Sequence, residues 1–269
     1  MRADLVPDDL WERVAPLLPR APERRRRHPG RLRVPDRTAL AGVLFVLRTG
    51  VAWRDVPAET VGCSGVTAWR RLRDWTEAGV WPRLHAALLA ELRRAGLLDL
   101  DDCSVDGSHI RALKRGAHVG PSPVDRARPG SKHHLIVDRH GTPLAVTLTG
   151  GNRHDVTQLL PLLDTIPPVR GLRGRPRRKP RRLYADRGYD FDKYRRQLWK
   201  RGIKPMIARR GVAHGSGLGK VRWVVERAFA WLHQFKRLRI RYERRADLHQ
   251  GLLELACSLI CLRRLGTSS

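Results

Sequence analysis

Apolar side chains recur at helical spacing through the first hundred residues. A short helical start is predicted over residues 7–18. A second helix is predicted over residues 38–49, with Asp36 as its N-cap and Gly50 as its end. Its apolar residues share one face: Leu40, Val43, Leu44 and Leu47.

Two more helices are predicted before residue 100. Ser64 is a suitable N-cap for a helix over residues 64–78. Its apolar residues, Val66, Trp69 and Leu72, are expected on one side, and its basic residues on the others: Arg70, Arg71 and Arg73. A further helix over residues 81–95 carries Leu84, Leu88 and Leu92. A helix, a turn and an arginine-rich helix form a helix-turn-helix, which predicts DNA binding. A three-helix bundle with surface arginines is the alternative.

From residue 101 the pattern changes to short apolar runs of strand length. Strands are expected over residues 103–107, 134–138, 144–148, 183–186 and 203–208, the second and third joined by a hairpin turn at 139–142. Helices are expected over residues 156–163, capped by Asp155, and over residues 190–200 and 221–237. This order fits an α/β (α+β) domain with a mixed sheet flanked by helices, as in the ribonuclease-H-like fold. We therefore predict a helical module over 1–99 and a ribonuclease-H-like domain over 100–269.

The chain is strongly basic, with 54 Lys and Arg against 26 Asp and Glu and a net charge of +28. Such an excess predicts a polyanionic partner and excludes most enzymes of small neutral metabolites. The last third, residues 170–269, is the most basic part. Arginine tracts at residues 20–37, including Arg24 and Arg25, and at 170–182 are either solvated linkers or phosphate contacts, and we favour phosphate contacts.

Several other classes of protein are not indicated. No apolar run approaches the ~20 residues of a membrane span, and no signal peptide is predicted, so we expect a cytoplasmic protein. Cys257 and Cys261 lie four residues apart in an apolar stretch, and buried reduced thiols are favoured over a zinc pair.

Three acidic residues occupy informative places. Asp106 and Asp186 each end a predicted strand, and Glu226 lies on the 221–237 helix. In this topology the first and fourth strands are central neighbours, so the two strand ends would meet. Carboxylate oxygens suit Mg²⁺ or Mn²⁺, and two such ions about 4 Å apart catalyse phosphoryl displacement in known two-metal sites.

The 221–237 helix has two different faces. Arg222, Glu226 and His233 fall within about 40° of one another, away from the apolar side. Taken alone, Arg222 and Glu226 would be an ordinary surface ion pair. Trp223 lies off the apolar face and is a candidate for stacking on an unpaired base at a cut DNA end.

Taken together, these segments resemble DDE-type bacterial insertion-sequence transposases of the insertion-sequence-five-like family. The resemblance runs over nearly the whole chain and is carried by residues 47–57, 104–108, 134–138 with Gly141, 149–155, 185–190 and 222–243. It implies that Asp106, Asp186 and Glu226 hold two Mg²⁺ or Mn²⁺ ions. It also implies DNA contacts in the C-terminal signature, from Arg222, His233, Lys236 and Arg237.

Two positions depart from the family pattern. Gly219 stands where a tyrosine is common, and His233 where a lysine is common. The implied activity is cleavage of double-stranded DNA at terminal inverted repeats and transfer of the cut strands to target DNA, by a homodimer on the DNA. Two alternatives remain: a catalytically silent DNA-binding derivative, and a nuclease without strand transfer. His154 and Asp155 form either a second shell around the metal ions or a turn and helix cap.

Overall fold

The computed structural model describes residues 5–21, 23, 27, 32–211 and 219–267. Arg24 and Arg25, predicted to contact DNA, lie outside these residues. The first part of the described chain is helical, as expected. Its elements are α1 (Asp8–Val14), η1 (Ala15–Leu17), α2 (Asp36–Thr49), η2 (Trp53–Asp55), α3 (Ala58–Val61), α4 (Gly65–Glu77) and α5 (Val80–Arg94).

The helix ends follow local chemistry. Gly50 adopts a left-handed φ of 76° and ends α2, and the Ser64 hydroxyl accepts a hydrogen bond from Thr67 N at 3.3 Å at the start of α4. Both predictions are confirmed. Asp36 is not the N-cap of α2, because the helix starts two residues earlier than the predicted residue 38 and Pro35 takes the N-cap position.

The apolar side of α4 differs from the prediction. Its buried residues are Gly65, Ala68, Leu72 and Trp75. Val66 is 54% exposed, because it lies on the opposite side of the helix. The face that packs in α4 therefore begins with two small residues, Gly65 and Ala68, which allow close approach of neighbouring backbone, and continues with Leu72 and Trp75.

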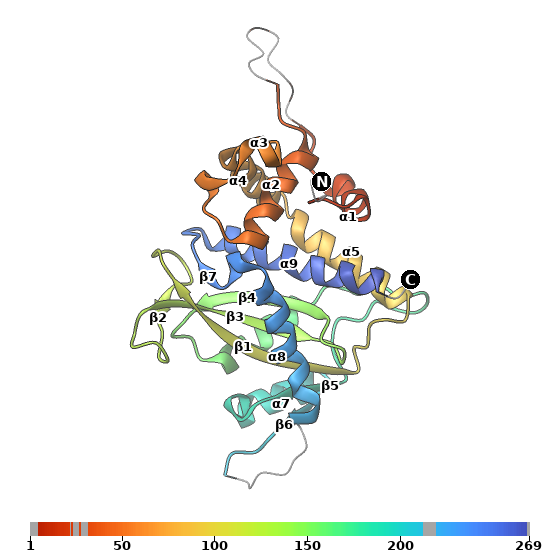
Figure 1. Cartoon of the computed structure of the whole chain (residues 1–269). Helices are drawn as coiled ribbons and strands as arrows, with labels where there is room; N and C mark the ends of the chain where they lie inside the picture. The colour runs from red at the N-terminus through yellow and green to blue at the C-terminus, as the bar shows by residue number, and fades with distance from the viewer. Residues whose placement is uncertain (1–4, 22, 24–26, 28–31, 212–218, 268–269) are drawn as a thin grey trace.

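A seven-stranded mixed sheet forms the second part (Figure 1). Its strands are β1 (Asp102–Ala112), β2 (Gly120–Pro121), β3 (Pro129–Val137), β4 (Pro143–Gly150), β5 (Arg182–Ala185), β6 (Lys204–Ile207) and β7 (Ile240–Arg241). The order is β2-β3-β1-β5-β6, with β4 paired to β3 and β7 to β1. β3 and β4 are antiparallel, whereas β5 and β6 run parallel to β1 and to each other. This order confirms the predicted hairpin, the central β1–β5 pair and the ribonuclease-H-like mixed sheet.

Helices follow or cover the sheet: η3 (Asp155–Gln158), α6 (Leu159–Asp164), η4 (Arg187–Tyr189), α7 (Asp192–Lys200), α8 (Gly219–Gln234), η5 (Lys236–Leu238) and α9 (Ala246–Gly266). The helix predicted over 221–237 thus ends at Gln234. α8 crosses β1 and β3, and α9 lies beside α5 and against β4 (Figure 1). α9 was not predicted as a helix, and it joins the sheet and the N-terminal helices in one hydrophobic core.

All four cysteines are free and buried, which confirms the prediction for Cys257 and Cys261. No helix of the described part of the chain is long and apolar enough to cross a membrane.

Candidate active site

Asp106 and Asp186 come together through the register of two parallel strands. β1 and β5 pair from Asp102–Arg182 to Ser104–Tyr184. Continuing that register by two residues sets Asp106 beside Asp186, just past the end of β5. The predicted juxtaposition follows from this register, but β1 does not end at residue 107. It continues to Ala112 because its second half pairs with β3 and β7.

Backbone N–H groups orient both carboxylates. Asp106 Oδ1 accepts a hydrogen bond from Gly107 N, and Asp186 Oδ1 accepts one from Gly188 N, each at 2.8 Å. The pKa of Asp106 is raised to about 6, mainly by burial and also by the nearby Asp186 and Asp155 carboxylates, against the lowering effects of Gly107 N–H and Arg222. Asp106 therefore lies in a partly buried site with excess negative charge.

Arg222 of α8 stands between the acid on β1 and the acid on its own helix. Its Nη2 is 3.7 Å from Asp106 Oδ2 and 3.8 Å from Glu226 Oε1. The side chain of Glu226 is 66% exposed, whereas that of Arg222 is 22% exposed. The structure thus links Glu226 to Asp106 through a guanidinium group.

Asp155 is a fourth carboxylate of this region. His154, not Asp155, is the N-cap of η3, so the predicted capping role is wrong. Asp155 Oδ1 instead accepts a hydrogen bond from Lys132 Nζ at 3.0 Å, and a Cβ on Gly107 would lie only 2.8 Å from it. Residues 149–155, singled out by the resemblance, were the sequence signal for this placement.

The chemistry of these donors suits a hard divalent cation, because all are carboxylate oxygens and the pKa of Asp106 is raised by burial and by neighbouring negative charge. The described residues contain no ready-made group of three or more acidic, histidine or cysteine side chains that could hold a metal ion. Asp106 and Asp186 are the pair that the fold brings together, and Glu226 lies nearby on α8.

The predicted DNA contacts on α4 lie in different environments. Arg70 is exposed. Arg71 Nε is 3.0 Å from Asp36 Oδ1, and only 12% of its side chain is exposed. Arg73 pairs with the adjacent Asp74 at 2.8 Å. Arg70 is therefore the most accessible of the three.

The predicted contacts near the end of α8 also differ. Lys236 is exposed, and Trp223 is 47% exposed with the Arg227 guanidinium 4.3 Å from its ring centroid. His233 is half-buried, and its pKa is lowered by burial and by Arg239.

Arg237 requires a correction, because it is only 4% exposed. Its Nε and Nη2 donate to Glu243 Oε1 at 2.9 and 2.7 Å, and its Nη1 donates to Val51 O at 3.0 Å. Arg237 joins the core to the N-terminal helices and is not available to a phosphate.

Comparison with known proteins gives two family matches. Residues 99–261 match the family described as “Transposase DDE domain”, and residues 6–85 match “Putative transposase of IS4/5 family”. The first covers more than half of the chain and includes Asp106, Asp186 and Glu226.

Individual relatives agree with these matches. The “Putative transposase for insertion sequence element IS402” of Burkholderia cepacia is 66% identical over 143 residues, 53% of this chain and 68% of the relative. The transposase for insertion sequence element IS1106 of Neisseria meningitidis serogroup B is 28% identical over 137 residues, 47% of this chain and 42% of the relative. Among solved structures, the Mos1 strand transfer complex matches with a TM-score of 0.34 and 13% identity, over 88% of this chain and 77% of that chain. On the family and sequence matches, the chain belongs to the DDE insertion-sequence transposases of the IS4/5 type.

Proposed function

We propose that this protein binds the terminal inverted repeats of an insertion sequence, cleaves the DNA there and joins the 3′-hydroxyl ends to target DNA. The observation that carries the proposal is the register that sets Asp106 beside Asp186, where the pKa of Asp106 is raised to about 6. Two carboxylates held together by two backbone strands, in a chain of net charge +28, form a cation site facing a polyanion.

Asp106, Asp186 and Glu226 would hold two Mg²⁺ or Mn²⁺ ions in this proposal. When bound, the ions would supply charge stabilisation to the attacking and leaving oxygens of a phosphoryl displacement. Arg222 neutralises part of the acidic charge beside Asp106 and is placed to contact a phosphate near the cut. Gly107 N–H and Gly188 N–H keep the two carboxylates in fixed orientations.

In this proposal, exposed basic residues outside the acidic cluster bind the DNA. Arg70 on α4 and Lys236 after α8 are exposed and would contact phosphates, as would the basic tract 170–182. Trp223 would stack on an unpaired base at the cut end.

We further propose that residues 1–99 recognise the repeat and that residues 100–269 carry out the chemistry. A homodimer in the bacterial cytoplasm would cut both ends.

The test is incubation of the protein with Mg²⁺ and a labelled duplex taken from the DNA that flanks its gene. Nicked and strand-joined products are expected. Asp186→Asn should still shift the duplex in a gel but give no products, whereas Asp192→Asn, an exposed acid six residues away on α7, should cleave like the wild type. Binding without cleavage by the wild type would support the silent derivative instead, and nicks without joining would support a nuclease.

A further inference from the structure

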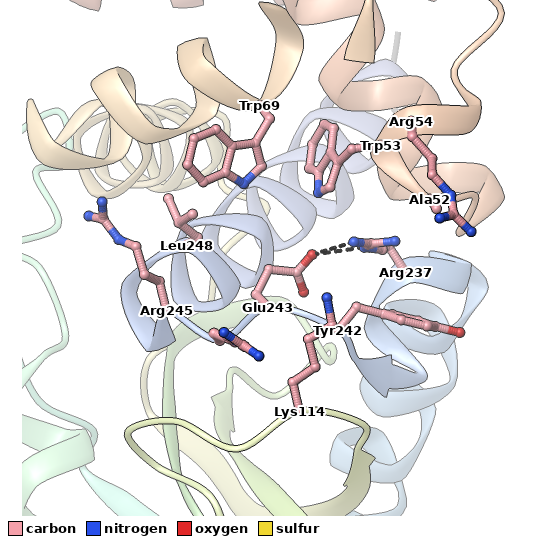
Figure 2. Close-up of a pocket in the computed structure, with 11 residues that line it drawn as sticks. Ala52, Trp53, Arg54, Trp69, Lys114, Arg237, Tyr242, Glu243, Arg245 and Leu248 are labelled. Atoms are coloured by element: carbon pink, nitrogen blue, oxygen red, sulfur yellow. Dashed lines mark hydrogen bonds and ion pairs between the residues drawn. The ribbon is translucent and has the colours of Figure 1, made fainter. Parts of the chain in front are cut away.

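A basic groove of about 510 Å³ lies where the N-terminal helices meet the core, and none of the three acids lines it (Figure 2). One side comes from residues 52–54 and from Trp69 on α4. The other side comes from Lys114, after β1, and from residues of the 242–248 segment that leads into α9. In Figure 2 the two tryptophans point into the groove from above and Lys114 points in from below.

A buried ion pair holds the walls of this groove in place. Arg237 Nη2 lies 2.7 Å from Glu243 Oε1, and the two side chains are 5% and 3% exposed. The Arg237 guanidinium also lies 5.6 Å from the ring centroid of Trp53 and 4.6 Å from that of Tyr242. The aromatic side chains are therefore positioned by a rigid cation behind them.

The lining is strongly positive. Its single carboxylate, Glu243, is paired with Arg237. Its five cationic side chains are those of Arg54, Lys114, Arg237, Arg244 and Arg245. Lys114 and Arg244 are exposed and form no ion pair with any described residue. The Arg54 side chain is 88% exposed. Arg54 lies 3.5 Å from the carboxylate of the adjacent Asp55, which is itself 59% exposed, and all three cations are accessible to an anionic ligand.

Trp53 adds an unused hydrogen-bond donor. Its indole Nε1 is buried and has no hydrogen-bond partner among the described residues. A buried donor without a partner is unfavourable, so an acceptor that reaches it would be favoured. One face of the ring meets Arg237, and the N–H edge is the polar group that lacks a partner.

We propose that this groove binds the phosphate backbone of one strand of duplex DNA, with Arg54, Lys114 and Arg244 pairing with phosphates and Trp53 Nε1 donating to a phosphate oxygen. The inference rests on the proposed function, because it assumes the same DNA lies at the acids. Lys114 follows the end of β1, and Asp106 lies six residues before that end. Six residues of strand span about 20 Å, which equals about six base pairs of duplex at 3.4 Å each. The groove would thus hold the duplex about six base pairs from the cut.

The test compares two double variants of the full chain on the flanking duplex used above. Lys114→Ala with Arg244→Ala removes two groove cations, and Arg94→Ala with Lys200→Ala removes two exposed cations outside the groove. Affinity falls as salt rises, and each lost phosphate contact makes the slope of log K against log salt less steep by about 0.9. Between 50 and 200 mM salt, the fold-loss of affinity should therefore be about twelve times smaller for the groove variant than for the wild type. The control variant should have the affinity and salt slope of the wild type.

Ethylation interference then locates the contacted phosphates, and ethylation about six base pairs from the cleaved bond is expected to block binding. Trp53→Phe, which keeps the ring, should weaken binding to the duplex several-fold with an unchanged melting temperature. A groove variant with wild-type affinity and salt slope would overturn the groove while leaving the cleavage result with Asp186→Asn untouched. Equal losses in both double variants, or a loss on single-stranded DNA alone, would also overturn it. Absence of all DNA binding by the wild type would remove the proposed function and the groove together.

Discussion

The Arg222 guanidinium on α8 lies 3.7 Å from the Asp106 carboxylate on β1. The contact joins the helix that carries Glu226 to the strand that carries the first acid. It lowers the pKa of Asp106 against the larger effect of burial, which raises that pKa to about 6. Arg222 thus acts on the protonation of Asp106 before any metal or DNA is bound.

Replacing Arg222 by glutamine should move the acid limb of cleavage to higher pH. Without the positive charge, the pKa of Asp106 rises above about 6, and a protonated carboxyl is a poor cation ligand. The pH profile of single-turnover cleavage, measured at saturating DNA so that weaker binding does not contribute, would show the shift.

The matched control for this prediction is Arg222→Lys, which keeps the charge and should leave the acid limb close to that of the wild type. A glutamine variant that loses rate equally at all pH values would show that Arg222 contacts only DNA and does not act on Asp106.

Asp106→Asn should stabilise the metal-free protein at neutral pH. A folded-state pKa of about 6, against 3.8 in a free carboxyl, means that ionising Asp106 costs folding free energy once the pH exceeds 3.8. The cost is present in full above pH 6 and reaches about 3 kcal/mol, with about half of it at pH 5. Urea unfolding in EDTA at pH 7.5 and pH 5 would measure the gain at each pH.

Glu226→Gln provides the comparison for this measurement, because its side chain is 66% exposed. Its effect on unfolding should stay within about 0.5 kcal/mol. If Asp106→Asn were destabilising at pH 7.5, burial of its negative charge would not be the dominant feature of the site.

The sequence was sufficient to predict the β1–β5 pair and the meeting of Asp106 with Asp186, because strand order follows from the alternation of strands and helices. It was not sufficient for α9. That helix buries thirteen of its residues against the sheet and α5, so its apolar positions form no single stripe. The length of β1 was hidden for a related reason, since polar residues such as His109 and Arg111 continue a strand that is paired on both sides.

Individual arginines were the least predictable part of the site. Arg237 and Lys236 are adjacent in a basic segment, yet one is buried and the other exposed. The difference depends on Glu243, which lies beyond β7 and returns to pair with Arg237 only in the folded chain. Local sequence gives charge, but tertiary contacts decide whether the charge is available to DNA.

Glu243→Gln should destabilise the protein by about 3 kcal/mol near neutral pH. The pKa of Glu243 is about 2, because hydrogen bonding by His249 and the charge of Arg237 outweigh burial. A pKa lowered from 4.5 gives stability that is present above pH 4.5 and lost as the pH falls towards 2. Urea unfolding of wild type and variant at pH 7 and pH 4 would show a smaller difference at the lower pH.

Asp192→Asn serves as the surface counterpart, because the Asp192 and Arg209 side chains are 72% and 55% exposed. Removal of this pair should change the free energy of unfolding far less than Glu243→Gln does, because solvent screens exposed ion pairs. Equal losses for the two variants would mean that the Arg237–Glu243 pair is not protected from solvent.

Gly65→Ala should weaken both folding and DNA binding. Gly65 begins α4 against η2, and a Cβ there would lie 1.6 Å from the carbonyl oxygen of Trp53, so the backbone that carries Trp53 must move. Overpacking of this kind costs about 1–3 kcal/mol, and displacement of Trp53 would disturb one wall of the groove. Gly266→Ala is the control, because nothing lies within 4 Å of a Cβ at that position. Urea unfolding and a duplex titration would test both effects; a Gly65→Ala variant as stable as Gly266→Ala would show that α4 and Trp53 are not in fixed contact.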